Sequence, residues 1–256
     1  MAEQTGPLKL QHLGAEIAYR IDGPADAAIP GLLWLGGFKS DMTGTKAEAL
    51  AAFAARDGRR LVRFDYFGHG VSGGRFIEGT IGRWKADAVH ILDSVCEGPQ
   101  ILVGSSMGGW IALLAALARP EKVAGLVLIA PAPDFTEELM WAGFSDEIRA
   151  TILREGVYRQ PSEYDEEPYE ISRALIEDGR EHLLLKHPIA LDKPVRILQG
   201  MQDEDVPWRH ALKLVEALSG DDVTVTFVKN GDHRLSKPTD IARLEREIAA
   251  LLAELA

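Results

Sequence analysis

The sequence has one cysteine, no long apolar run and no excess of basic residues. The single thiol, Cys96, excludes an internal disulfide framework and any thiolate-rich zinc or iron–sulfur site. It falls near the end of an expected amphipathic helix, which favours an inert, half-buried thiol over a nucleophile. No apolar stretch reaches the roughly 20 residues that a membrane-spanning helix needs, so we expect no stable membrane insertion. The formal net charge of −11 disfavours nucleic acid and anionic membranes as partners, because both attract basic surfaces.

The N-terminus also lacks the features of a targeting segment. It shows neither the basic start and apolar run of a secretory signal nor the arginine-rich, acid-poor composition of a transit peptide. We therefore expect a reducing compartment, the cytoplasm, with the mitochondrial matrix as the alternative if a leader has been removed. The 256 residues suit one domain that buries roughly 75% of its unfolded surface and needs no disulfide support.

Short apolar segments alternate with helical patterns along most of the chain. The first of them, Leu8 to Ile21, has the pattern of two strands around a His-Leu-Gly turn. Strands separated by helices predict an α/β fold with a mostly parallel central sheet and helices on both faces. Further strands are expected at residues 32–35, 61–64, 101–103, 127–129, 195–198 and 223–228, and helices near 47–56, 81–95 (capped by Thr80), 110–118, 208–218 and from 239 onward.

Residues 133–187 interrupt this alternation, and no strand pattern is evident among them. The segment contains helix-like pieces, prolines at 161 and 168, and acidic residues at 163 and 165–167. So long an insertion is either a helical lid or a disordered segment. Because apolar residues are scattered through it, we expect a helical cap at 133–187, inserted into an α/β core made of residues 1–132 and 188–256.

Ser106 lies in a turn flanked by glycines, with a strand expected before it and a helix after it. Residues 104–108 are Gly-Ser-Ser-Met-Gly, and Gly-x-Ser-x-Gly in that context is typical of a nucleophile elbow. In such a strained turn, the residues two before and two after the serine pack so closely that side chains would collide. Ser106 has glycine at both positions, whereas Ser105 has Val103 and Met107 there, so Ser106 is the predicted nucleophile.

A serine hydroxyl needs a general base and an acid that orients the base, and in this fold the chain order is serine, acid, histidine. Asp203 and His233 each follow an expected strand, at the sheet edge where α/β folds place their sites. We predict that His233 takes the proton of Ser106 and that Asp203 holds the imidazole, with Asp205 as the alternative acid. The other histidines considered lie too early in the chain, within expected helices or in the insertion: His12, His90, His182, His187 and His210.

The oxyanion of an acyl-transfer intermediate needs main-chain donors near the serine. One is expected to be the amide of Met107, which follows the nucleophile. The other is expected to be the amide of Phe38, because Gly36 and Gly37 let that loop approach closely; the alternative there is a plain glycine turn. Four residues of the insertion are candidates for an acyl-binding site, although packing of the cap on the core explains them equally well: Leu139, Met140, Trp141 and Phe144.

Two further patterns resemble nucleotide-binding loops but lack the required context. Residues 68–73 match G-x-G-x-x-G, yet no apolar helix opens directly after them, so we expect a structural turn in which His69 makes local hydrogen bonds. Residues 44–46, Gly-Thr-Lys, resemble the end of a phosphate loop, but the upstream glycine spacing is wrong, and the start of a helix is expected. The histidines form no i, i+4 pair, so we predict no metal.

Taken together, these motifs resemble one branch of the α/β-hydrolase superfamily. They look like those of the mitochondrial palmitoyl-protein thioesterase/acyl-glucuronide esterase family and its bacterial relatives. The resemblance implies a triad at Ser106, Asp203 and His233, deacylation of S-acylated cysteines and hydrolysis of carboxylic esters, without a cofactor. The lack of a transit peptide points to a bacterial relative. The matching segments are residues 42–47 (Met-Thr-Gly-Thr-Lys-Ala), 65–70 (Asp-Tyr-Phe-Gly-His-Gly), 104–110 (Gly-Ser-Ser-Met-Gly-Gly-Trp) and 118–123 (Ala-Arg-Pro-Glu-Lys-Val).

The sequence thus predicts a serine hydrolase that cleaves carboxylic esters or acyl thioesters through an acyl-enzyme intermediate. Its expected partner is a small-molecule ester or acyl thioester, with S-acylated protein as a further candidate. An amidase or peptidase stays open because the triad does not distinguish leaving groups. A non-catalytic ligand receptor stays open because fold alone does not establish function. Dehalogenase and epoxide-hydrolase activities are disfavoured, because their nucleophile is normally an aspartate.

Overall fold

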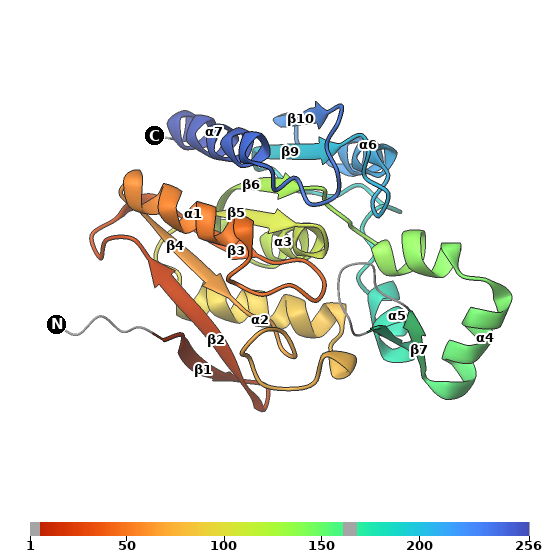
Figure 1. Cartoon of the computed structure of the whole chain (residues 1–256). Helices are drawn as coiled ribbons and strands as arrows, with labels where there is room; N and C mark the ends of the chain where they lie inside the picture. The colour runs from red at the N-terminus through yellow and green to blue at the C-terminus, as the bar shows by residue number, and fades with distance from the viewer. Residues whose placement is uncertain (1–5, 161–167, 256) are drawn as a thin grey trace.

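An eight-stranded, mostly parallel sheet forms the centre of the protein (Figure 1). The computed structural model describes residues 6–160 and 168–255. The strands lie in the order β1-β2-β4-β3-β5-β6-β9-β10; β2 pairs antiparallel with β1 and β4, and the other neighbours are parallel. Their bounds are β1 Leu8–His12, β2 Ala15–Asp22, β3 Ala28–Leu35, β4 Arg59–Phe64, β5 Gln100–Ser105, β6 Val123–Ile129, β9 Val195–Gly200 and β10 Val223–Val228.

Helices cover both faces of the sheet. Because successive side chains of a strand point to opposite faces, Leu32 and Trp34 of β3 pack in one buried cluster, and Leu33 and Leu35 in another. The first cluster includes residues of α1 and α7, and the second includes residues of α2, α3 and α6. The predicted fold class is thus confirmed. The helix bounds are α1 Thr45–Arg56, α2 Ile81–Ser94, α3 Met107–Ala118, α6 Trp208–Ala217 and α7 Pro238–Glu254.

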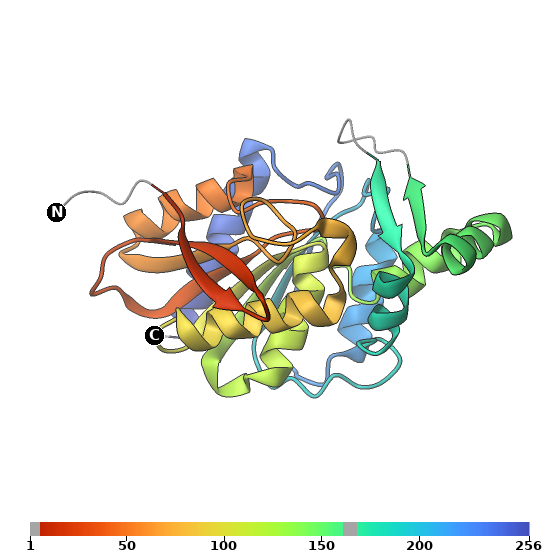
Figure 2. The same ribbon diagram turned by 90° about the horizontal axis from the view of Figure 1, so that it is seen from below.

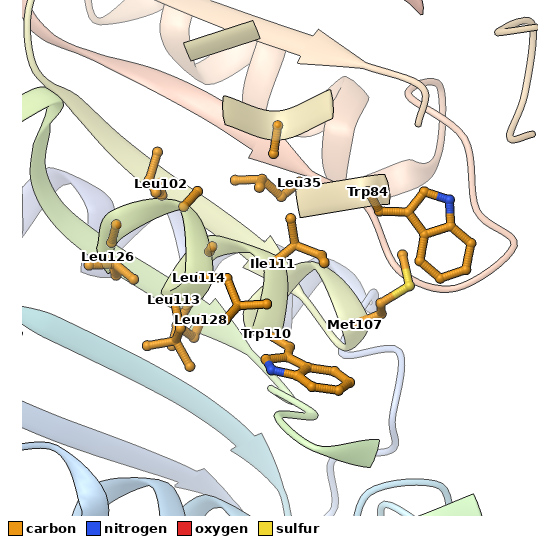
Figure 3. Close-up of a cluster of buried hydrophobic side chains, with 14 of the residues drawn as sticks. Leu35, Trp84, Leu102, Met107, Trp110, Ile111, Leu113, Leu114, Leu126 and Leu128 are labelled. Atoms are coloured by element: carbon orange, nitrogen blue, oxygen red, sulfur yellow. The ribbon is translucent and has the colours of Figure 1, made fainter. Parts of the chain in front are cut away.

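Helix α3 is buried on nearly all sides, as its apolar sequence predicts. Residues 107–116 are all buried. Its side chains lie in one cluster with side chains of β3, β5 and β6 (Figure 3). The N-terminus of α3 is therefore fixed against the end of β5, where the serine turn lies. The labelled members of this cluster from the strands are Leu35, Leu102, Leu126 and Leu128.

Two local sequence signals fix element boundaries as predicted. Leu13 and Gly14, with φ of 45° and 80°, form the turn between β1 and β2, and two consecutive positive φ values suit a two-residue hairpin. Helix α2 begins after Thr80, whose side chain accepts a hydrogen bond from the amide of Arg83.

Residues 133–160 and 168–187, which we call the cap, lie beyond the carboxyl ends of the parallel strands (Figures 1 and 2). Short helices make up most of it, as expected, but two antiparallel strands are present as well. The expectation that this segment has no strand is therefore wrong. Each strand has four residues, too few to show alternation. The elements are η3 Thr136–Trp141, a π-helix, α4 Asp146–Glu155, β7 Val157–Gln160, β8 Tyr169–Ser172 and α5 Arg173–Arg180.

The cap has a small apolar cluster of its own and a polar contact between its two ends. The carboxylate of Asp134 is buried and accepts hydrogen bonds from the amides of Leu184 and Leu185 at 2.8 and 2.9 Å. It therefore joins the chain that enters the cap to the chain that leaves it. The division into core and cap stays a prediction, and the acidic residues 163 and 165–167 lie outside the described residues. The buried members of the cap cluster are Ile152, Ile171 and Ile176.

Within residues 6–160 and 168–255, no helix has both the length and the apolar composition that crossing a membrane requires.

Candidate active site

Ser106 occupies a strained backbone position between β5 and α3. Its φ is 56° and its ψ is −119°, a combination that residues with a side chain rarely adopt. The Ser106 amide donates to the carbonyl of Ile129 in β6 at 2.9 Å, and the Ala132 amide donates to the Ser106 carbonyl at 3.1 Å. These bonds fix the turn, which presents the serine at the carboxyl end of the sheet and beside the N-terminus of α3.

The two glycines of the turn are required by close main-chain contacts. A Cβ atom on Gly104 would lie 2.4 Å from the carbonyl oxygen of Gly108. A Cβ atom on Gly108 would lie 2.1 Å from the carbonyl oxygen of Leu35, at the end of β3. The predicted collision of side chains at these positions is thus confirmed.

Three side chains from three separate loops form one hydrogen-bonded chain. Nε2 of His233 lies 3.0 Å from Oγ of Ser106, and Nδ1 of His233 lies 2.9 Å from Oδ2 of Asp203. Because a carboxylate can only accept, Nδ1 carries the proton, and Nε2 accepts from the serine hydroxyl. The structure brings together the three residues that the sequence analysis selected, in an arrangement suited to proton transfer from Ser106.

Asp203, rather than Asp205, supplies the carboxylate that contacts the histidine. Its side chain is buried, and Oδ1 accepts hydrogen bonds from the amides of Asp205 and Val206 at 3.0 and 2.8 Å. The side-chain amide of Gln199 donates to Oδ2 at 3.1 Å. These donors fix the orientation of the carboxylate and compensate for its burial.

Asp203, Asp205 and His233 are also close enough to be considered as metal ligands. A search of the described residues for three or more histidine, cysteine or acidic side chains with their ligand atoms within 4.8 Å of one another finds this group. Both ring nitrogens of His233 already have partners, Ser106 and Asp203. The group therefore suits proton transfer better than metal binding, and we assign no metal to it.

The loops that carry Asp203 and His233 pack against each other through their main chains. The amide of Gln202 donates to the carbonyl of Gly231 at 2.9 Å. A Cβ atom on Gly200 would lie 2.5 Å from that same oxygen. The separation of the acid and the base is therefore set by backbone contacts.

The amides of Phe38 and Met107 have no acceptor within the part of the chain that the structure describes. Met107 is the first residue of α3, a position whose amide has no partner inside the helix. Phe38 follows Gly37, where a Cβ atom would come within 3.5 Å of Cβ of Ser106. Both residues border the cavity that contains the serine, so both amides are placed to act as oxyanion donors.

A cavity of about 770 Å³ lies between the core and the cap and includes Ser106 and His233 in its wall. This volume falls in the range of small-molecule sites. The cap side is mainly apolar, and the core side carries charges of both signs. Residues on the apolar side include Phe135, Leu139, Met140, Phe144, Tyr169 and Ile171, and charged residues on the other side are Lys39, Asp41, Lys46, Glu204, Asp205 and Arg234.

Three of the four apolar cap residues selected from the sequence border this cavity: Leu139, Met140 and Phe144. Trp141 does not. Its ring lies between the guanidinium groups of Arg149 and Arg180, at 5.7 and 4.8 Å. Neighbouring residues of a helix point in different directions, so Trp141 faces away from the surface that Met140 presents to the cavity.

Strand β8 supplies two lining residues that the sequence analysis missed, Tyr169 and Ile171. The ring of Tyr169 lies 5.9 Å from the ring of Phe38 and 5.4 Å from Nζ of Lys39. The cap therefore contacts the loop after β3 directly. In the sequence, these two apolar residues are separated by one polar residue, as in a strand with one buried face. Two positions are too few to identify a strand.

Lys46 joins α1 to the loop that follows His233. Its Nζ donates to Oγ of Ser236 at 3.3 Å and to the carbonyl of Arg234. Burial lowers the pKa of Lys46 to about 8; the charge of Arg234 acts in the same direction, and that of Asp232 in the opposite one.

The chain is similar in sequence to several known proteins. A family model described as serine aminopeptidase, S33, matches residues 37–164. The palmitoyl-protein thioesterase ABHD10, mitochondrial, of Mus musculus is 42% identical over 227 residues, which cover 88% of this chain and 76% of that protein. The chain belongs to the α/β-hydrolase superfamily. The Homo sapiens protein of the same name is 40% identical to this hydrolase, over 88% of this chain and 74% of that protein.

Solved structures resemble this hydrolase over nearly its whole length. A putative hydrolase from Agrobacterium vitis S4 has a TM-score of 0.92 at 46% identity, covering 97% of this chain and 98% of that one. The α/β-hydrolase domain-containing protein 10 from mouse has a TM-score of 0.90 at 38% identity, covering 98% and 100%.

Replacing Gly104 by alanine is expected to destabilise this hydrolase, because the new methyl group would lie 2.4 Å from a main-chain oxygen. We expect the free energy of unfolding, measured by urea denaturation, to fall by about 3 kcal/mol. Gly143→Ala is the matched control, since nothing lies within 4 Å of its Cβ position. Equal stability of Gly104→Ala and the wild type would contradict the close contact.

The lowered pKa of Lys46 predicts a pH-dependent term in stability. Between about pH 8 and 10.5 the unfolded chain binds more protons at this lysine than the folded chain, so its contribution to the free energy of unfolding rises with pH. Relative to Lys46→Met, the wild type should therefore gain about 1–3 kcal/mol over this range. Urea denaturation at each pH measures the difference, with the exposed Lys229→Met as control. A constant difference would refute the shift.

Proposed function

We propose that this hydrolase cleaves carboxylic esters or acyl thioesters, with Ser106 as nucleophile, His233 as general base and Asp203 as the acid that orients the base. The observation that carries the proposal is the hydrogen-bonded chain of these three side chains beside a cavity with one apolar side. Membership of the α/β-hydrolase superfamily, and relatives named palmitoyl-protein thioesterases, support it.

Acylation begins when Oγ of Ser106 attacks the acyl carbon and Nε2 of His233 takes the hydroxyl proton. Negative charge develops on the acyl oxygen, where the amides of Phe38 and Met107 and the positive end of α3 stabilise it. The tetrahedral intermediate then collapses. The bond to the leaving oxygen or sulfur breaks, and His233 donates its proton to that atom. Asp203 stabilises the imidazolium while it carries the extra proton.

Deacylation repeats these steps with water as the nucleophile. His233 takes a proton from the water molecule as its oxygen attacks the acyl carbon of the Ser106 ester. Collapse of the second intermediate returns the proton to Oγ of Ser106 and releases the carboxylic acid. The substrate and water supply every atom of the products, so the reaction requires no cofactor.

The two sides of the cavity suggest how the substrate lies. An acyl chain fits the apolar side, against Leu139, Met140 and Phe144 of the cap, which would act as a lid. The alcohol or thiol then lies on the charged side formed by the core. An S-acylated cysteine satisfies this arrangement as well as a small ester does, because only the acyl group needs to enter fully.

A peptidase or amidase is the second candidate, and the description of the matching family model as serine aminopeptidase favours it. Aminoacyl p-nitroanilides, assayed beside p-nitrophenyl esters of graded chain length, acyl-CoA and S-acyl peptides, distinguish the two. Faster turnover of the anilides would replace the proposed function by this one.

For the compartment, the relatives give more information than the N-terminus. The ABHD10 proteins of mouse and human are named mitochondrial, which supports the mitochondrial matrix over the cytoplasm.

Ser106→Ala is expected to lower kcat by about 10⁴-fold or more, because the triad acts as a unit. A fluorophosphonate probe should label the wild type at Ser106 and leave the variant unlabelled. Ser105→Ala is the matched control, since the adjacent hydroxyl has no part in the mechanism, and it should be labelled like the wild type. A folded wild type that is neither labelled nor active would favour the non-catalytic receptor.

Met140→Trp is expected to shorten the acyl chain that the cavity accepts, because a larger ring would fill part of its apolar side. We expect kcat/KM for long-chain p-nitrophenyl esters to fall about tenfold or more, with little change for acetate or butyrate esters. Leu153→Trp, at a half-exposed position on α4, is the control. An unchanged chain-length profile would show that the acyl group lies elsewhere.

A further inference from the structure

The turn that follows β4 contains a buried histidine that the proposed mechanism does not use. His69 is 3% exposed. The rings of Tyr66, Phe76 and Trp84 surround it, with centroids 5.6, 5.1 and 5.1 Å from its own. It belongs to the G-x-G-x-x-G pattern of residues 68–73, which forms a turn as expected and is not followed directly by an α-helix.

Each ring nitrogen of His69 contacts a main-chain group that can act only as a donor or only as an acceptor of hydrogen bonds. Nε2 accepts a hydrogen bond from the amide of Lys39 at 3.2 Å, and Nδ1 lies 3.1 Å from the carbonyl oxygen of Phe67. An amide can only donate and a carbonyl can only accept, so both bonds form only when Nδ1 carries the single proton of a neutral ring. Burial lowers the pKa of His69 to about 4, which favours this neutral form near pH 7.

Lys39 directly follows Phe38, whose amide is a proposed oxyanion donor. Residues 37–40 form a turn that the amide of Ser40 closes on the carbonyl of Gly37 at 3.2 Å. Lys39 has a φ of 59°, whereas Phe38 is outside the left-handed region, a combination typical of a type II turn. Glycine is preferred at the third position of such a turn, so a lysine there needs support from outside the turn.

We propose that His69 is a positioning residue for the oxyanion-stabilising loop. Its neutral ring holds the amide of Lys39 and thereby keeps the adjacent amide of Phe38 directed at the acyl oxygen of the substrate. Without this acceptor, the peptide group between Phe38 and Lys39 can rotate toward the type I form that most residues prefer. His69 does not border the cavity, so it acts through Lys39 and Phe38. The inference rests on the proposed serine-hydrolase function.

His69→Phe tests this role, because phenylalanine keeps the aromatic packing and removes the acceptor. We expect kcat per active site to fall by roughly 10- to 100-fold while KM stays within about twofold, since the lost contact acts in the transition state. Active sites are counted from the end point of fluorophosphonate labelling. The affinity of an acyl trifluoromethyl ketone, whose adduct carries the oxyanion, should fall by a similar factor, and that of an unreactive thioether analogue should not change.

His69→Gln is expected to restore part of kcat, because its side-chain oxygen can accept from the amide of Lys39. His210→Phe is the matched control. His210 is also buried, and its Nε2 lies 2.7 Å from the carbonyl of Pro133, so this variant should lose stability and keep kcat per site. If His69→Phe does not fold, His69→Asn, which is too short to reach Lys39, takes its place with the same expected loss. If the variant that lacks the acceptor has the same kcat per active site and the same inhibitor affinity as the wild type, the proposal is overturned.

The tautomer of His69 can be measured without any activity. Long-range ¹⁵N–¹H spectra of histidine-labelled protein near pH 7 identify the ring of His69 as the one whose signals are missing from His69→Gln, and this ring should be protonated at Nδ1 alone. Protonation of this ring at Nε2, or at both nitrogens, would overturn the inference. Because the wild type and Ser106→Ala are assayed in parallel, failure of the hydrolase function would appear as an inactive, unlabelled wild type and would be distinguished from failure of this role.

Discussion

The structure of the site depends on one close approach of main chains at the serine turn. The end of β3, the end of β5 and the start of α3 meet with no space for a side chain at Gly104 or Gly108. Because α3 is buried on nearly all sides, the turn cannot relax by moving the helix. Ser106 therefore stays at positive φ, and the buried cluster around α3 compensates for the strain.

The other groups reach Ser106 from loops on either side of β5 in the sheet. The loops of Asp203 and His233 are held together by a main-chain hydrogen bond between Gln202 and Gly231, and a Cβ atom on Gly200 would collide with the Gly231 oxygen. Backbone positions vary less than side-chain rotamers, so such contacts maintain distances of about 3 Å between groups that are far apart in sequence. The strand order, in which β3 and β6 lie beside β5, therefore determines which loops reach Ser106.

The sequence determined the core, the order of its elements and the three residues of the hydrogen-bonded chain, because these depend on local patterns. Periodicity identified the strands and helices, and flanking glycines distinguished Ser106 from Ser105. The missed features depend on short elements or on contacts that no local pattern shows. Strands β7 and β8 have four residues each, too few to show alternation, and Trp141 lies beside Arg149 and Arg180 instead of the cavity. The hydrogen bond between His69 and Lys39 joins two loops 30 residues apart, which no local pattern predicts.

The cap has a small apolar cluster of its own, and it also packs on the core, because Phe135 and Leu175 belong to the buried cluster around α3. In the proposed mechanism, selectivity for the acyl group depends on the cap side of the cavity, and bond cleavage depends on the core. The cap also contacts the loop after β3, where Tyr169 of β8 packs against Phe38. In that mechanism, a shift of the cap would act on the amide of Phe38 through this contact and would couple acyl binding to the acylation step.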